Sequence, residues 1–210
     1  MKAVEAKGVT VLSKWGGKGL TKETVKNAAR ASLNLVVNVS GMRLARYMES
    51  EFGIPYIAGA PFGKEGLDEF TDLMMKTLSG ETSDSCIICK GIEGTDDAEV
   101  IIAGEQFFCN AIRKDLYNKG YSNIRVISFF EMDKACMVSS DKKISGEDEL
   151  NEICSKEKVK LVCADPDYRP AVRKEVKWIN MPNSGMSMVT RIPQMDLIGQ
   201  SLDDWISSEL

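Results

Sequence analysis

Short apolar runs alternate with amphipathic segments along most of the chain. The runs at 33–39, 54–59 and 98–104 contain β-branched residues and little polar alternation, which is typical of strands buried on both faces of a parallel sheet. Between the first two runs, 42–52 repeats apolar residues at helical spacing, and Gly53 is expected to end that helix. The order of strand, helix and strand predicts a β–α–β unit.

The same alternation continues on both sides of a polar stretch at 80–97, which we interpret as a linker. Further strands are expected at 124–130, 159–165 and 177–182, and further helices at 22–33, 67–80, 105–120, 145–157, 169–176 and 196–210. Ser145 and Asp148 have the spacing of a capping box at the start of one helix.

We therefore predict an α/β fold of two Rossmann-like lobes, each with a parallel sheet flanked by helices. Residues 1–92 are expected to form an incomplete first lobe, and residues 93–210 the second. Residues 1–20 are too short to complete a doubly wound sheet, so the chain is expected to be one part of a longer protein.

Composition and charge place the chain among ordinary globular proteins. Of its 210 residues, 43% are hydrophobic and 28% are charged, and the net charge is −4. This acidic balance argues against an extended nucleic-acid surface, and no apolar run approaches the roughly 20 residues that span a bilayer. Residues 1–15 also lack the apolar core of a signal peptide. We therefore expect a cytoplasmic protein with neither nucleic acid nor membrane as a partner.

The chain contains no histidine. This absence excludes a Ser-His-Asp or Cys-His hydrolase and any zinc or haem site with a histidine ligand. The six cysteines are expected to be reduced in the cytoplasm, where disulfides are rare.

Polar residues and glycines follow several of the expected strands. In open parallel α/β sheets, ligands bind beyond the carboxyl ends of the strands, next to helix N-termini. The ligand-cleft candidates selected by this rule are Pro61, Gly63, Gly104, Glu105, Gln106, Asp165, Asp167, Tyr168, Arg169, Asn183 and Ser184. These residues are expected along two sheet edges that face one cleft.

The loop at 165–169 supports two interpretations. Arg169 carries a planar guanidinium suited to a carboxylate or phosphate, which favours an anionic-ligand site or a contact to a partner protein. Alternatively, Asp165 caps the following helix and Arg169 pairs with it. Glu105 is similarly open to two interpretations, because the helix dipole favours an acidic side chain in the first helical turn.

Cys86 and Cys89 form the single Cys-x-x-Cys spacing in the chain. Two cysteines at this spacing can supply half of a tetrahedral metal site or form a redox pair. Because Ile87 and Ile88 lie between them and no second such pair exists, packing of the two thiols in the core is the competing interpretation.

Three stretches, at 31–63, 104–130 and 147–199, together resemble the nitrogenase component 1 type oxidoreductase family. The resemblance includes an apolar strand, a helix that runs into FGIPY, and the glycine-rich loop GAPFG at 59–63. It implies Rossmann-like lobes around a cleft for a metallocluster or tetrapyrrole, a sister subunit or homodimer, and an ATP-dependent iron–sulfur reductase that delivers electrons. The match is to the C-terminal half of such a subunit.

The missing histidine separates this chain from true nitrogenase, in which a histidine of the C-terminal region ligates the catalytic cofactor. The first hypothesis is therefore part of an oxidoreductase subunit whose iron–sulfur cluster or metallocluster belongs to the full-length complex; this segment alone is expected to be inactive. The second hypothesis is a non-catalytic scaffold or binding module for metallocluster or tetrapyrrole assembly. A two-lobed module that closes around a small anion is a third.

Overall fold

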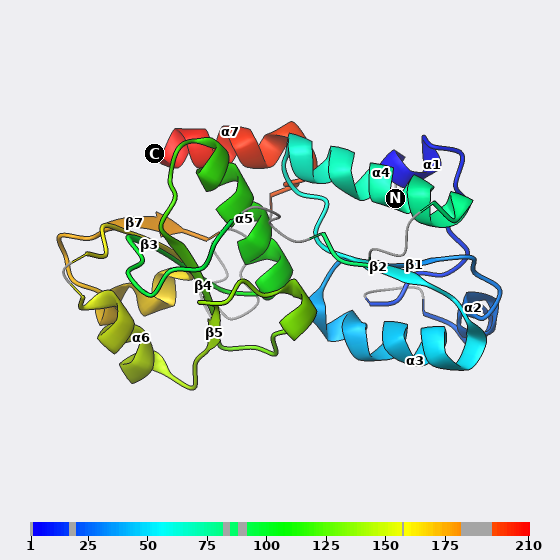
Figure 1. Cartoon of the computed structure of the whole chain (residues 1–210), viewed down its shortest axis with the longest axis horizontal. Helices are drawn as coiled ribbons and strands as arrows, with labels where there is room; N and C mark the ends of the chain where they lie inside the picture. Colours follow the sequence, from blue (N-terminus) through cyan, green and yellow to red (C-terminus); the bar gives the residue numbers. More distant parts are fainter. Residues whose placement is uncertain (1, 17–19, 82–84, 88–91, 157, 182–194) are drawn as a thin grey trace.

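The computed structural model describes residues 2–16, 20–81, 85–87, 92–156, 158–181 and 195–210. In this part of the chain, two parallel sheets lie side by side, each flanked by helices (Figure 1). The predicted α/β architecture of two lobes is therefore confirmed.

The first lobe is built on a two-stranded parallel sheet. Its elements in chain order are α1 (Lys2–Glu5), α2 (Lys22–Ala28), β1 (Asn34–Val36), the 3₁₀ helix η1 (Val39–Gly41), α3 (Met42–Phe52), β2 (Tyr56–Ala58) and α4 (Lys64–Ser79). β1 and β2 pair with Leu35 opposite Ile57. Helix α3 covers one face of this sheet and α4 covers the other (Figure 1).

Local sequence explains where the helices of this lobe end. Gly53 and Gly80 follow α3 and α4 with φ angles of 65° and 76°, the left-handed conformation that glycine adopts most readily. Helix α2 is shorter than the expected 22–33, because it buries only Ala28 and so receives little support from tertiary packing.

The second lobe is a five-stranded parallel sheet with the order β5-β4-β3-β6-β7. Its elements are β3 (Val100–Ala103), α5 (Gln106–Asn118), β4 (Ile124–Ser128), η2 (Lys134–Cys136), β5 (Lys142–Lys143), α6 (Glu147–Cys154), β6 (Leu161–Ala164), η3 (Pro166–Ala171), β7 (Lys177–Asn180) and α7 (Gln200–Glu209). The short strand β5 was not predicted, because its two lysines are both exposed.

Alternate residues of the central strand β3 face opposite sides of the sheet. Val100 and Ile102 pack in the core with α5 and α7, whereas Ile101 and Ala103 pack in the core with α6. All four residues are buried, and the sequence of the strand is therefore a continuous apolar run.

Two local predictions in this lobe were wrong in detail. The helix expected at 169–176 does not form, and the chain there contains the 3₁₀ segment η3 instead. Pro166 and Pro170 of η3 have no backbone N–H to donate to a helix. The expected capping box of Ser145 and Asp148 does not form: Gly146 is the N-cap, and the carboxylate of Glu149 accepts from the backbone N–H and the hydroxyl of Ser145.

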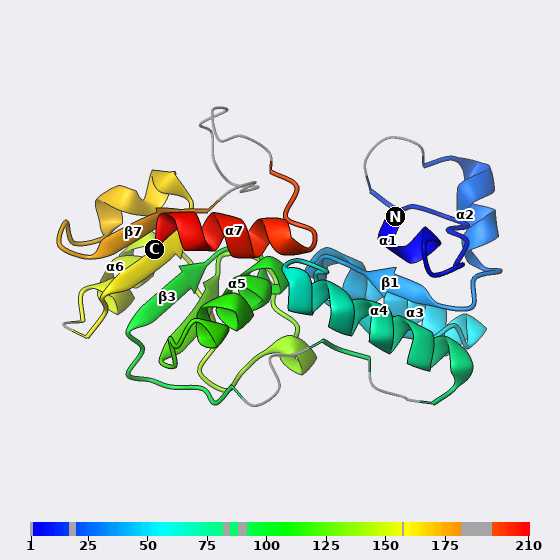
Figure 2. The same ribbon diagram turned by 90° about the horizontal axis from the view of Figure 1, so that it is seen from above.

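Helix α7 joins the two lobes. Its buried residues Leu202, Trp205 and Ile206 pack in the core of the second lobe, while its first turn lies beside the start of α4 (Figures 1 and 2). There the carboxylate of Asp203 accepts a 2.8 Å hydrogen bond from the backbone N–H of Lys64.

In the sequence, the strands of the first sheet precede residues 92 and 93, the expected boundary between lobes, and the strands of the second sheet follow them. Because α7 contacts both lobes, this boundary stays a prediction. No helix among the described residues combines the length and the apolar character that crossing a bilayer requires.

Candidate functional site

The carboxyl ends of the two sheets meet at a junction between the lobes. Val39, in η1 after β1, donates its backbone N–H to Oε1 of Glu105 at 2.9 Å. Phe62, in the loop after β2, packs edge-on against Phe108, with ring centroids 5.5 Å apart. The candidates at 61–63 and 104–106 are thereby brought to one place, as the strand-end rule predicts.

Glu105 is the N-cap of α5. Its Oε2 accepts from the backbone N–H of Phe108 at 2.9 Å, so each carboxylate oxygen holds a backbone amide, one from each lobe. Burial raises the pKa of this carboxyl, and the amide donors partly oppose that shift. The side chain thus ties the start of α5 to the first lobe.

Gln106 is fully buried and holds the backbone of a single residue. Its Oε1 accepts from the N–H of Asp133 at 2.7 Å, and its Nε2 donates to the carbonyl of Asp133 at 2.9 Å. The Asp133 carboxylate in turn makes two contacts with Arg46 of α3, at 2.6 and 2.8 Å. This charge-assisted pair raises the pKa of Arg46 and forms a second link between the lobes.

Gly104 leaves no room for a side chain. A Cβ placed there would lie 2.7 Å from Sδ of Met181 and 3.2 Å from Sγ of Cys109. The glycine therefore allows close packing within the second lobe at the end of β3.

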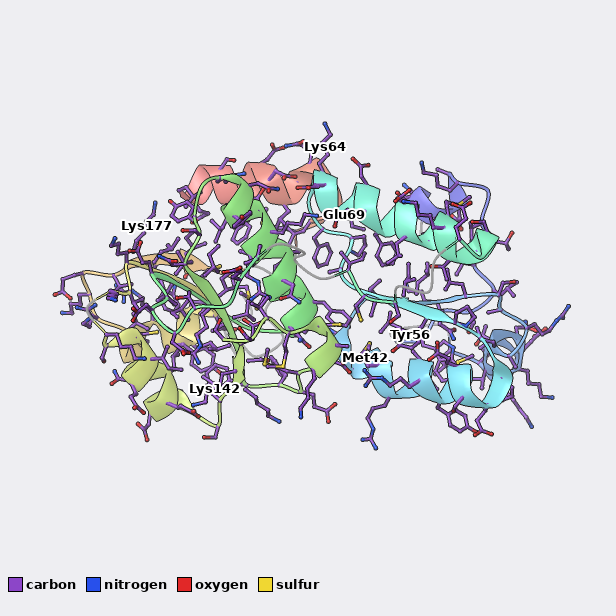
Figure 3. The ribbon with its side chains drawn as sticks, viewed as in Figure 1. Met42, Tyr56, Lys64, Glu69, Lys142 and Lys177 are labelled. Carbon is purple, nitrogen blue, oxygen red and sulfur yellow. The ribbon has the colours of Figure 1, made fainter. Side chains whose placement is uncertain are left out.

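A buried apolar cluster beside the Glu105 and Arg46 links contains residues of both lobes. Met42 lies at the end of α3 nearest the second lobe, and Tyr56, the first residue of β2, directs its side chain toward α3 (Figure 3). They belong to one buried cluster with Phe107, Cys86 and Cys136. Burial of this shared surface favours the association of the lobes.

Cys86 and Cys136 contact each other inside this cluster, with their Sγ atoms 3.2 Å apart. The thiol of Cys136 donates to Cys86, and this hydrogen bond lowers the pKa of Cys86 to about 7. The same bond raises the pKa of Cys136, because removing its proton would break it.

A small cavity lies at the junction. It has a volume of about 20 Å³ and is lined by the 59–62 loop, Ile87 and residues of α5 that include Phe107, Asn110 and Lys114. A cavity of this size is enough for one water molecule. Lys114 also pairs with Glu69 of α4 at 2.5 Å, and Glu69 points toward α5 in Figure 3.

A buried ion pair positions the segment that carries Asp133 and Cys136. Arg113 and Asp141 have fully buried side chains and contact each other at 2.6 Å. Asp141 also accepts from the backbone N–H groups of Val126 and Val138, at 3.1 and 2.8 Å. Asn110 then donates to the carbonyl of Cys136 at 2.9 Å.

The 165–169 loop makes the following contacts within the second lobe. Asp165 caps η3 by accepting from the N–H of Asp167 at 3.0 Å, and Tyr168 stacks on Phe129 with ring centroids 4.4 Å apart. Burial raises the pKa of Tyr168.

Arg169 donates to four backbone carbonyls: those of Val172, Arg173 and Lys174, each at 3.0 Å, and that of Val176 at 3.5 Å. Its guanidinium also lies 5.5 Å from the ring centroid of Trp178. The capping role expected for Asp165 is present, whereas the guanidinium of Arg169 binds carbonyls in these contacts. Asn183, Ser184 and Cys89 lie outside the described residues.

The sequence reasoning missed Arg46, Asp133 and Cys136. No local motif marks them: Arg46 and Asp133 are 87 positions apart, and Cys86 and Cys136 are 50 positions apart. The one available signal was topological, because η1 and α3 follow β1 at the carboxyl edge of the first sheet, and the 104–106 loop follows β3 at the carboxyl edge of the second.

These lobes define the chain as an α/β protein with two parallel sheets joined at their carboxyl edges. A family model described as nitrogenase component 1 type oxidoreductase matches residues 2–138, and the chain belongs to that family. Its fold is similar to a solved structure described as "Nitrogenase Cp1 at pH 6.5", with a TM-score of 0.55 and 15% sequence identity. The alignment covers 96% of this chain and 50% of that chain, so this chain spans about half the solved one. No curated protein matches it.

The described residues do not by themselves fit a metallocluster of the kind this family typically binds. Cys86 and Cys136 offer two sulfur donors, and in the described ranges no group of three Cys, Asp or Glu side chains is placed to hold a metal ion. The oxygens of Glu105 already accept backbone hydrogen bonds. The cavity beside them has a volume of about 20 Å³, which is too small for a metallocluster.

Proposed function

We propose that this chain acts as part of a nitrogenase component 1-like oxidoreductase subunit and is not a true nitrogenase. In this role the subunit accepts electrons from an ATP-dependent iron–sulfur reductase and reduces a bound substrate. The observation that carries the proposal is the family match, because residues 2–138 include β1, β2, β3 and the junction where their carboxyl ends meet.

The junction is the proposed place of action. The loops at 61–63 and 104–106 lie there, and we propose that Asp165, Asp167, Tyr168, Arg169, Asn183 and Ser184 contribute to the same ligand surface or to a partner contact. Because the described donor set does not hold a cluster, the proposed metallocluster is bound with residues outside the described ranges. We propose that a sister subunit or a second copy of the chain supplies these residues.

A non-catalytic scaffold or binding module is the second candidate. The observation that favours it is the complete absence of histidine, which leaves the chain without the commonest general acid–base group and metal-binding imidazole. Such a scaffold would hold a metallocluster precursor or a tetrapyrrole without reducing a substrate. In both roles we propose that the protein works in the cytoplasm.

Electron transfer separates these two functions. The full protein is purified anaerobically together with its gene neighbours, and its iron, acid-labile sulfide and visible absorption are measured. An iron-protein-type reductase is then added with ATP or with ADP. Bleaching of the bound chromophore with ATP alone is the result expected of the oxidoreductase.

A bound chromophore that does not respond to ATP would favour the scaffold. A complex without iron and without tetrapyrrole would refute both. Arg46→Ala offers a junction variant for the same assay, and Arg43→Ala offers a control on an exposed position of the same helix. Loss of chromophore in Arg46→Ala alone is expected if the junction holds the redox group.

A further inference from the structure

Cys86 and Cys136 are held in contact by different lobes. The residues on both sides of Cys86 are fixed to β2, because Ala58 donates to the carbonyl of Ser85 at 2.7 Å and accepts from the N–H of Ile87 at 2.8 Å. Cys136 ends η2, and Asn110 of α5 holds its carbonyl. The 3.2 Å contact between the sulfurs therefore results from the positions of two backbones fixed by other bonds.

The two sulfurs differ in exposure and charge. Cys86 keeps 9% of its surface exposed and Cys136 keeps 1%. The hydrogen bond from Cys136 lowers the pKa of Cys86 below the usual thiol value, and the proton between the sulfurs stays on Cys136. A more accessible sulfur with a lowered pKa beside a fully buried thiol is the arrangement found where one sulfur attacks and the other resolves.

We propose that Cys86 and Cys136 form a reversible disulfide that covalently joins the two lobes. This inference does not depend on the proposed electron-transfer function. It assigns a modification site to the junction, with a low-molecular-weight disulfide such as oxidised glutathione as the oxidant.

The chemistry is a pair of thiol–disulfide exchanges. The Cys86 thiolate attacks one sulfur of glutathione disulfide, a bond forms between them, and one glutathione leaves as a thiolate. Cys136 then loses its proton and attacks Sγ of Cys86, which releases the second glutathione. Two protein thiols become one disulfide, and one glutathione disulfide becomes two reduced glutathiones.

The bond changes how the lobes are held. The sulfurs must approach from 3.2 Å to about 2.05 Å, and the resulting bond closes a loop across the junction between residues 86 and 136. In the reduced protein the lobes are joined by the Glu105 and Arg46 links, the shared apolar cluster and α7. In the oxidised protein separation of the lobes also requires reduction.

Peptide mapping tests the assignment directly. The full protein is incubated with glutathione disulfide at pH 7, free thiols are alkylated with iodoacetamide, and the product is digested with trypsin. Cys86 and Cys89 fall in one peptide, 77–90, and Cys136 falls in another, 135–142. The expected product is a crosslink between these two peptides that dithiothreitol removes.

Cysteine variants decide which sulfur is linked. Cys89→Ser should keep the crosslink, and Cys86→Ser should abolish it. Cys154→Ser, which replaces a buried thiol in α6, is the matched control and should also keep it. A disulfide confined to peptide 77–90, a stable glutathione adduct on Cys86, or no reaction in excess oxidant would each overturn the proposal.

Two further measurements do not depend on digestion. Oxidation should raise the melting temperature by about 10 °C, because it restricts the unfolded chain over a long loop, and Cys136→Ser should remove this gain. Alkylation of Cys86 should shift to higher pH in Cys136→Ala, which removes the donating thiol, relative to the wild-type protein. An unchanged alkylation profile in Cys136→Ala would contradict the hydrogen-bonded pair.

Discussion

Replacing Gln106 with alanine tests whether the junction is held by its buried amide. The substitution removes both hydrogen bonds to Asp133, at 2.7 and 2.9 Å, and leaves a buried N–H and a buried carbonyl without these partners. Each unsatisfied group costs about 1–3 kcal/mol. We therefore expect Gln106→Ala to lower the free energy of unfolding by about 2–5 kcal/mol.

Urea unfolding followed by far-ultraviolet circular dichroism measures this loss, with an unchanged slope against urea showing that the surface exposed on unfolding stays the same. Asn118→Ala is the matched control on the same helix. Its amide bonds the carboxylate of Glu65 at the surface, so its loss should cost less than about 1 kcal/mol. Equal effects of the two variants would refute the reasoning.

Gln106→Glu separates hydrogen bonding from volume. A glutamate of nearly the same shape can accept from the Asp133 N–H but, when ionised, cannot donate to the Asp133 carbonyl. Burial raises the pKa of such a carboxyl, so acidification should restore the donor and recover part of the lost stability. A stability deficit that does not shrink on acidification would contradict this account.

Three further predictions concern other contacts. Burial, with a hydrogen bond to Asp203, raises the pKa of Asp115 from 3.8 to about 6. The protonated carboxyl therefore stabilises the folded protein fully below about pH 4, and this stability is lost as the pH rises through 6. Urea unfolding should therefore show Asp115→Asn gaining about 1–2 kcal/mol over wild type between pH 4 and 7, after allowance for solvent screening. Arg169→Ala should cost about 1–3 kcal/mol in the same assay without weakening the binding of partners, whereas lost binding at unchanged stability would identify a ligand site. Gly104→Ala should cost about 1–3 kcal/mol through its contact with Met181, and a double-mutant cycle with Met181→Ala should show a less than additive loss.

The sequence predicted the fold well because parallel strands buried on both faces leave a strong local signal. The runs around Val100 and Leu161 read as strands because all their residues are buried. The exceptions are short or polar elements: Lys142 and Lys143 form a strand through backbone pairing alone, with no apolar residue to indicate it.

The candidate site could be predicted in position but not in its contacts. The strand-end rule brought Gly63 and Glu105 to one junction, since the rule depends only on topology. It could not foresee that Glu105 binds a backbone amide from each lobe, or that Cys86 faces Cys136 rather than a nearby cysteine. Such contacts depend on distances between segments that only the assembled fold sets.

The position of α7 in the sequence affects how the protein folds while it is being synthesised on the ribosome. Asp203 and its partner Lys64 are 139 positions apart, so the first lobe is synthesised long before the helix that fastens it to the second. Until α7 emerges, the apolar surface that it later covers on α5 is exposed to solvent and to other nascent chains. We therefore expect the unfinished polypeptide to bind chaperones, and release should follow once residues 200–209 have docked.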